Sequence, residues 1–253
     1  MSEIMIALAG QLSTYLLKAE ETAQARYREL REEILKEFAR PNGKGKPEVF
    51  ADPDFQFVIK DAHESFARSG EKPLREELVR LLIERSTYKS GSRTALILNA
   101  AIRASGSLTL EDISVLAVLF MMKAVTFTAN SIDTIAPKYE FMLSPFVGSL
   151  SSEVHAFEYL ESLGCITIER VADVWPLDEN AHRRFAHLSP SEITKEELWD
   201  KLVHGSPSLR IVADLWPQAY YRHSTLTALG KALAHSALES KQVMDAPLTV
   251  WVK

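Results

Sequence analysis

Apolar residues recur at steps of three and four positions along the first part of the chain, which is the spacing of one face of an α-helix. No proline interrupts residues 4–39, and the turn-forming sequence Pro41-Asn42-Gly43 follows directly. Residues 20–40 are dense in Glu and Arg on the opposite face. The pattern therefore predicts one long amphipathic helix over residues 4–39. Its apolar stripe consists of Leu8, Leu12, Leu16, Ala19, Ala23, Tyr27, Leu30, Ile34 and Phe38.

Helix start signals then follow one another at short intervals. Asp52-Pro53-Asp54 combines a capping carboxylate, a proline at the first helical position and an acid near the positive end of the helix dipole. Thr109 and Asp112 fit a capping box, in which the hydroxyl and the carboxylate each satisfy a backbone amide. Residues 52–128 are therefore predicted to form a compact bundle of short helices. Further helices of this bundle are predicted to begin at Pro73 and near Ser92.

The C-terminal part of the chain mixes helical patterns with alternation of period two, which is typical of strands. Residues 132–145 are interpreted as a helix broken by prolines. The region after residue 148 is therefore predicted to be a small α+β module. Its strands are predicted over 165–169, 220–226 and 248–252, and its helices over 152–163 (ending at Gly164), 194–204 (opening with a Thr194 to Glu197 capping box) and 227–238.

Together these patterns predict a mainly α fold in three parts. Residues 1–43 form a long helix, residues 44–148 a helical bundle, and residues 149–253 a small α+β module of winged-helix-like pattern. The apolar stripe from Leu8 to Phe38 would span about 45 Å at 1.5 Å per residue. The short helices of the bundle can cover only two or three turns each.

The apolar stripe of the long helix can be covered in two ways, either within its own chain or by another copy. Amphipathicity alone shows that a face is buried and not what buries it. We expect part of the stripe to form a homo-oligomeric interface. The contacts expected there are Leu12, Leu16, Tyr27 and Ile34.

Two blocks of sequence stand out in the middle and near the end of the chain. The first runs from Asp52-Pro53-Asp54-Phe55-Gln56-Phe57 through Ala67-Arg68-Ser69-Gly70 to Leu108-Thr109, and the second is Leu226-Thr227-Ala228-Leu229-Gly230-Lys231-Ala232-Leu233-Ala234. The first resembles an uncharacterised bacterial family of helical proteins. The second resembles a strand-to-helix ending that this family shares with small winged-helix-like modules. The resemblance implies a helical fold and brings no catalytic residues with it.

A winged-helix-like module makes nucleic-acid binding the alternative function. The helix that would enter the groove, residues 152–163, carries three glutamates and no Lys or Arg. Residues 151–253 hold 14 acidic and 10 basic residues, a net charge of −4. Since groove recognition needs donors for phosphates and guanines, we expect no specific binding to duplex DNA.

We find no recognisable catalytic or metal-binding motif in the sequence. His63-Glu64 lacks the second histidine of an HExxH helix, and His182 and His187 are not four positions apart. The single Cys165 excludes a multi-cysteine zinc site and is interpreted as a small buried hydrophobe. We therefore assign no catalytic, cofactor or metal site and expect a non-enzymatic protein. An enzyme with an unrecognised site is the third alternative.

Two arginine-containing segments are candidates for anion binding. Arg183 and Arg184 lie between two histidines, and Arg222 follows two tyrosines. Guanidinium groups and aromatic rings suit an anion or a nucleotide if they meet in space. The favoured alternative is a solvated loop and an amphipathic strand. Four tryptophans lie in the C-terminal part, where core positions are favoured and an interface is the alternative: Trp175, Trp199, Trp216 and Trp251.

Composition narrows the class of protein further. The chain has 253 residues, of which 46% are hydrophobic and 25% charged, and its net charge of −5 gives no general attraction to nucleic acid or anionic lipid. The apolar runs at residues 1–17 and 113–129 fit neither a signal peptide nor a membrane span. We expect a cytoplasmic interaction or assembly protein that binds itself or another protein.

Overall fold

The computed structural model describes residues 3–41, 43–126, 129, 131–170, 176–189 and 193–252, with side chains described from residue 12 onward. The chain is mainly α, with a small two-stranded antiparallel sheet, so the predicted fold class is confirmed. It divides into two compact units, Met1–Ser107 and Leu108–Lys253. Trp175, which was interpreted as a core residue, lies outside the described residues.

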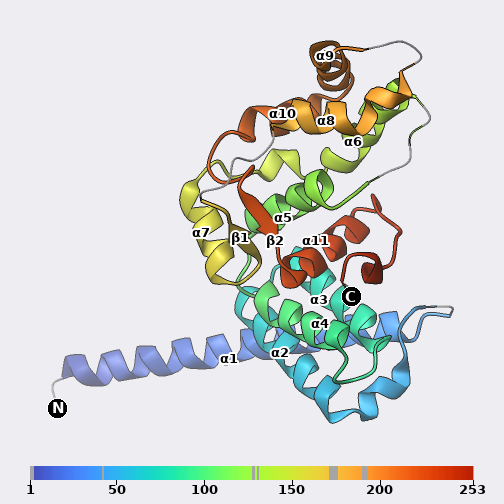
Figure 1. Cartoon of the computed structure of the whole chain (residues 1–253). Coiled ribbons are helices and arrows are strands. Elements are labelled where there is room, and N and C mark those ends of the chain that lie inside the picture. The colour runs from blue at the N-terminus through green and yellow to red at the C-terminus, as the bar shows by residue number, and fades with distance from the viewer. Residues whose placement is uncertain are drawn as a thin grey trace. The chain divides into compact units, whose positions relative to one another are not determined.

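Unit 1 is a bundle of four helices (Figure 1). The long helix α1 spans Glu3–Phe38, as the apolar stripe predicted. The short helices are α2 (Pro53–Ser69), α3 (Lys72–Ser86) and α4 (Arg93–Ser105), with a 3-10 turn at Pro47–Ala51 before α2. The C-terminal half of α1 packs against α2 and α3, and α2 and α3 both pack against α4. The core of this unit includes Leu30, Phe55, Phe66, Leu78, Leu82, Leu98 and Ile102, all of them fully buried.

The predicted helix starts of unit 1 are confirmed. The side chain of Asp52 accepts a hydrogen bond of 3.0 Å from the backbone amide of Asp54, and Pro53 is the first residue of α2. Ser92 caps α4 in the same manner, through the amide of Ala95. Gly70 ends α2 in the left-handed conformation, with φ of 69°, which favours glycine.

Capping at Asp52 leads to a prediction about stability. Asp52→Ala should lower the free energy of unfolding by about 1 kcal/mol, because α2 loses its capping acceptor. The second carboxylate oxygen of Asp52 also accepts a hydrogen bond from the Ser90 hydroxyl. The loss of unfolding free energy should therefore be at least as large as that expected for the cap alone. Chemical denaturation measures the difference. Asp52→Asn is the control, because it keeps an acceptor at the cap, and an equal loss in both variants would contradict capping as the explanation.

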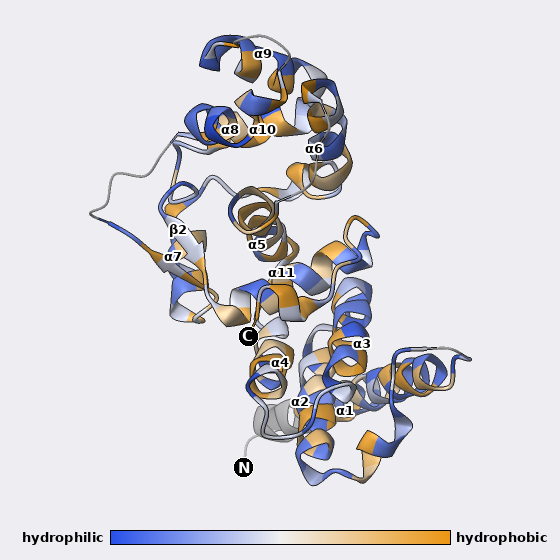
Figure 2. Cartoon of the chain, turned by 45° about the vertical axis from the view of Figure 1, so that its right-hand side comes forward, coloured by the Kyte–Doolittle hydropathy of each residue, from blue (hydrophilic) through white to orange (hydrophobic). Residues whose placement is uncertain are grey.

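Unit 2 is built around the apolar helix α5 (Leu110–Lys123), which packs against α11 (Ala228–Ser240). All residues from Val115 to Phe120 are fully buried, and Figure 2 shows the apolar colouring of this helix. The predicted capping box at Thr109 and Asp112 is confirmed. The other helices of the unit are α6 (Ile135–Leu143), α7 (Val154–Ser162), α8 (Leu177–Phe185), α9 (Lys195–Gly205) and α10 (Pro207–Leu215).

The sheet of unit 2 is a short ladder between β1 (Ile166–Ile168) and β2 (Ser224–Leu226). Ile166 pairs with Leu226 and Ile168 with Ser224. The turn from β2 into α11 explains the glycine of the second sequence block. A Cβ atom at Gly230 would lie 2.0 Å from the backbone oxygen of Cys165, so only glycine allows this close approach.

Several predictions for the C-terminal part need correction. Residues 248–250, predicted as a strand, form a 3-10 helix, because the chain turns after Pro247 and the Trp251 indole donates a hydrogen bond of 3.1 Å to the carbonyl of Ala124. The strand predicted at 220–226 is limited to β2. Helices α8 and α10 were not predicted as elements.

The compact units also differ from the three predicted segments. The predicted boundaries along the chain were at residues 43 and 148, whereas the boundary between the two units follows Ser107. The reason lies in the packing partners of two helices. The second half of α1 shares a core with α2 and α3, and α5 shares one with α11 and β2.

Candidate functional site

The C-terminal half of α1 is covered by its own unit. Leu30, Ile34 and Phe38 keep at most 7% of their surface exposed. One turn before Leu30 along α1, Tyr27 is half-buried and stacks on His63, with ring centres 5.2 Å apart. Arg26 marks the N-terminal limit of the contact between α1 and α2. Its guanidinium donates hydrogen bonds of 2.8 and 2.9 Å to the carbonyls of Ala67 and Arg68 at the end of α2.

From Leu12, where the described side chains begin, the N-terminal half of α1 continues the same stripe with exposed apolar side chains. Leu12 is 54% exposed, Tyr15 65%, Leu16 71% and Leu17 61%. Figure 1 shows this half of α1 running well past the ends of α2 and α3. Leu12, Tyr15 and Leu16 lie on one helical face, with Leu17 beside it. We call these four residues the N-terminal surface of α1. A cluster of exposed large apolar side chains on one face marks an interaction site.

The four predicted interface residues fall on two different parts of α1. Leu12 and Leu16 belong to the exposed N-terminal surface, where their interface role stays a prediction. Tyr27 lies at the border, against His63. Ile34 is only 3% exposed, so it belongs to the core of unit 1 and its placement on an interface is corrected. The apolar stripe is continuous in the sequence. It is divided into a buried and an exposed part only because α2 and α3 pack against the C-terminal half of α1.

The candidate anion-binding arginines lie in a different local structure from the one predicted. Arg183 and Arg184 belong to the last turn of α8, not to a loop. Arg184 donates hydrogen bonds of 2.7 Å to the carbonyl of Val125 and 3.1 Å to the hydroxyl of Thr126. The guanidinium of Arg184 therefore holds the chain after α5. For Arg183, Arg184 and Arg222 anion binding stays a prediction.

Lys123 gives the segment around Arg222 a further anchor. Its amine donates hydrogen bonds of 2.7 Å and 2.5 Å to the carbonyls of Arg222 and Ser224, and it lies 5.2 Å from the centre of the Trp216 ring. Burial lowers the pKa of Lys123 to about 8. The hydrogen bonds of Lys123 join the end of α5 to Arg222 and to Ser224, the first residue of β2.

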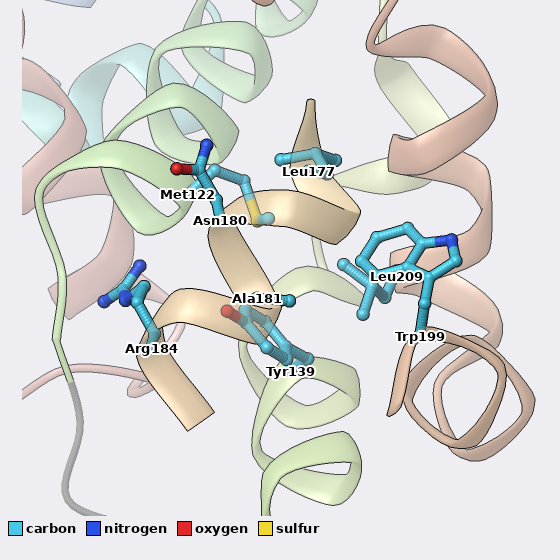
Figure 3. A pocket seen from close by; sticks show the side chains of 8 residues that line it. All are labelled: Met122, Tyr139, Leu177, Asn180, Ala181, Arg184, Trp199 and Leu209. Carbon is cyan, nitrogen blue, oxygen red and sulfur yellow. The ribbon is translucent and has the colours of Figure 1, made fainter. Parts of the chain in front are cut away.

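A small pocket lies between the helices of unit 2 (Figure 3). Its volume is about 280 Å³, including the part open to solvent. Because this figure counts open solvent, the enclosed space falls well short of the roughly 300–1,000 Å³ that is common for small-molecule sites. Arg184 and Trp199 stand at opposite sides of it in Figure 3, and burial raises the pKa of the Tyr139 hydroxyl. The lining residues are Met122, Tyr139, Leu177, Asn180, Ala181, Arg184, Trp199 and Leu209.

The most developed polar cluster of unit 1 surrounds Arg85, which is fully buried. Arg85 donates hydrogen bonds of 2.7 Å to Asn99, 3.0 Å to the carbonyl of Tyr88, 2.8 Å to Ser90 and 2.5 Å to Asp54. Asn99 also donates to Asp54, at 3.1 Å. Sequence reasoning missed this cluster, because nothing in the pattern around Arg85 distinguishes it from the other arginines of α3, Arg75 and Arg80. The cluster fixes α2, α3 and α4 to one another.

Hydrogen bonds to the Asp54 carboxylate hold the pKa of Asp54 below its ordinary value, and the largest cause is the bond from Asn99. Arg85 acts in the same direction, whereas partial burial opposes both. Asp54 is therefore charged at neutral pH and serves as the counter-ion of the buried guanidinium. Among the described residues no group of His, Cys, Asp and Glu is placed to hold a metal ion.

Cys165 is fully buried beside β1, as the sequence predicted. Burial raises the pKa of its thiol to about 12, with a smaller contribution from the charge of Asp112. At pH 8 the folded protein should therefore not react with a thiol reagent such as Ellman's reagent, because the thiolate is the reactive form. One equivalent should react after denaturation. Rapid reaction of the native protein would contradict this placement.

Helix α7 occupies the position that a groove-binding helix would take in the winged-helix interpretation. It carries Glu158 and Glu161 and no Lys or Arg. Glu161 accepts a hydrogen bond of 2.8 Å from the amide of Ile168 and pairs with Arg170, so it fastens α7 to β1. The chain between β1 and β2 contains α8, α9 and α10, which is far more than a wing. The described part of unit 2 thus gives nucleic-acid binding no support.

In the described part of the chain, no helix is both long and apolar enough to cross a membrane. Among curated proteins and among solved structures, none matches this sequence. The model of an uncharacterised protein family does match, over residues 8–188. This range begins inside α1 and ends after α8, so it includes the first of the two sequence blocks and not the second. Because the match covers well over half of the chain, the protein belongs to this uncharacterised family.

Proposed function

We propose that this protein is a non-enzymatic interaction or assembly protein of the bacterial cytoplasm, and that it associates with another protein chain through the N-terminal surface of α1. The observation that carries the proposal is the exposure of Leu12, Tyr15, Leu16 and Leu17 on a helix that extends past its own bundle. The single Cys165, which is buried and unpaired, supports a reducing compartment.

The energetic case rests on the apolar area that the surface leaves in water. Complete burial of a large aliphatic or aromatic side chain contributes roughly 1.5–3 kcal/mol. The four side chains of the surface are each more than half exposed, so most of this contribution is unused in the isolated chain. The continuous helix keeps them in fixed relative positions, which lowers the entropy cost of binding.

The oligomeric state in solution tests the proposal. The wild-type chain should sediment as a species larger than a monomer at high concentration. Leu12→Glu combined with Leu16→Glu should yield a folded monomer, because both side chains are exposed and their loss spares the core. Sedimentation velocity measures the mass, and circular dichroism measures the helix content.

A matched control lies on the same helix. Leu35 is 51% exposed, which is close to the value for Leu12, but it lies outside the N-terminal surface. Leu35→Glu should leave the oligomeric state unchanged. A wild-type monomer at all concentrations, or equal effects of the two replacements, would count against this surface as the site of assembly.

A further inference from the structure

The chain after α11 turns back onto that helix (Figure 1). Val243 is the last residue whose amide is bonded to α11, through a hydrogen bond of 3.1 Å to the carbonyl of Leu238. We call the residues that follow, 244–252, the C-terminal strap. Among the described residues, no backbone-to-backbone hydrogen bond joins the strap to the rest of unit 2. The strap is therefore held in place by contacts that involve side chains.

Two hydrogen bonds from ring nitrogens fasten the strap. His235 of α11 is 2% exposed, and its Nε2 lies 2.6 Å from the carbonyl oxygen of Ala246. Because a carbonyl only accepts, Nε2 carries the proton and donates this bond. The indole of Trp251 donates a bond of 3.1 Å to the carbonyl of Ala124, directly after α5. Within the described part of unit 2, these two hydrogen bonds join the strap to the rest.

Three apolar side chains complete the attachment. Leu248 and Val252 keep 1% and 2% of their surface exposed. The Trp251 ring packs against Phe120 of α5 and His235 of α11, with ring centres 5.0 and 5.7 Å away. All other residues of the strap are exposed or half-buried. These few contacts must offset the conformational entropy that the whole strap loses when it is ordered.

We propose that the C-terminal strap is a releasable cover, which opens as one unit while the rest of unit 2 stays folded, and that His235 is its latch. Segments with few buried apolar contacts and few backbone bonds to their surroundings open at a lower free energy than the core. An open strap uncovers Phe120, which is fully buried in the closed form. The device lets unit 2 hide or present an apolar surface, and it does not depend on assembly through α1.

A cysteine in the strap reports its opening in the full chain. Val252→Cys places a buried thiol there, and Ala237→Cys is the matched control. Ala237 is also buried, and it lies two positions from His235, so it is on the far side of α11. Ellman's reagent should react at least about tenfold faster with Val252→Cys, because the control thiol reacts only when unit 2 unfolds. The wild type, with its buried Cys165, gives the background rate.

A substitution at the latch separates its hydrogen bond from its packing. His235→Phe, introduced into the Val252→Cys chain, keeps a ring beside Trp251. It removes the donor to Ala246, so the thiol should react roughly two- to tenfold faster, as expected for one lost hydrogen bond. Ser240→Ala is the control, because its hydroxyl bonds within α11 and not to the strap, and it should leave the rate unchanged.

The second fastening provides an independent variant. Trp251→Phe keeps a ring against Phe120 and removes the donor to Ala124. It should also accelerate the reaction of Val252→Cys. Circular dichroism shows whether each variant keeps the helix content of the wild type, so a folding defect is distinguished from an open strap.

Hydrogen exchange tests the wild-type chain without a reporter. The amides of Trp251 and Val252 donate within the strap and should exchange faster than those of α11. Low urea should hardly change their exchange, since opening the strap exposes little surface. Equal rates and equal urea dependence at the strap and at α11 would overturn the proposal, because the strap would then open only when unit 2 unfolds. Fast opening that neither His235→Phe nor Trp251→Phe accelerates would also overturn it, because the strap would have no latch.

Discussion

Asp54→Ala is expected to lower the free energy of unfolding of unit 1 by about 3 kcal/mol. The variant leaves the guanidinium of Arg85 fully buried without its counter-ion. Asp54 keeps 41% of its side chain exposed, so the expected loss lies at the low end for broken buried ion pairs. Denaturant unfolding measures the loss. Asp61→Ala on the same helix is the control, because its partner Arg103 is exposed and the pair should contribute less than about 1 kcal/mol.

The two partners of this pair should not be equally costly to remove. Arg85→Met takes away the buried charge and leaves Asp54, which can be hydrated at its exposed side. We therefore expect a smaller loss than for Asp54→Ala, although Asn99 and Ser90 each lose a donor. The double variant should be more stable than the sum of the single losses predicts, because the uncompensated charge is gone. Strictly additive losses would show that the two residues do not act as a pair.

The contribution of Asp54 should also depend on pH. Its folded-state pKa lies below its ordinary value of 3.8, so folding favours the charged carboxylate. The resulting stabilisation is complete above pH 3.8 and is lost as the pH falls through the lower folded-state pKa. The difference in unfolding free energy between the wild type and Asp54→Asn should therefore be constant near neutral pH and shrink in strong acid.

Local signals in the sequence predicted much of the fold. Capping residues such as Asp52 and Thr109 act on amides within the next turn, so the prediction needs no knowledge of distant residues. The apolar run that begins at Ile113 is interrupted by Lys123 and by hydroxyl side chains, which favoured a buried helix over a membrane span, and α5 is buried. The 3-10 turn at 248–250 was mistaken for a strand, because β-branched residues favour extended structure only where a neighbouring edge is free to pair.

Long-range partners are what the sequence could not provide. The cluster of Arg85 joins three helices through side chains that are up to 45 positions apart. From the sequence, the helix dipole explained why an acid stands at position 54, in the first turn of α2. That Asp54 is also the counter-ion of Arg85 became visible only in the fold. The same limit applies to α1, because its apolar residues recur at the same helical spacing in the buried half and in the exposed half. Only the positions of α2 and α3 decide which part of it is core.

Ile34→Glu should therefore behave quite differently from glutamate at the neighbouring Leu35. Ile34 is 3% exposed and packs in the core of unit 1, where an unpaired carboxylate would be desolvated. We expect a loss of about 4 kcal/mol or more, enough to unfold unit 1 under ordinary conditions. Leu35 is 51% exposed, and Leu35→Glu should change the stability by less than about 0.5 kcal/mol. Thermal unfolding by circular dichroism separates the two results. A folded Ile34→Glu protein of reduced mass would show instead that the whole stripe of α1 is an interface between chains.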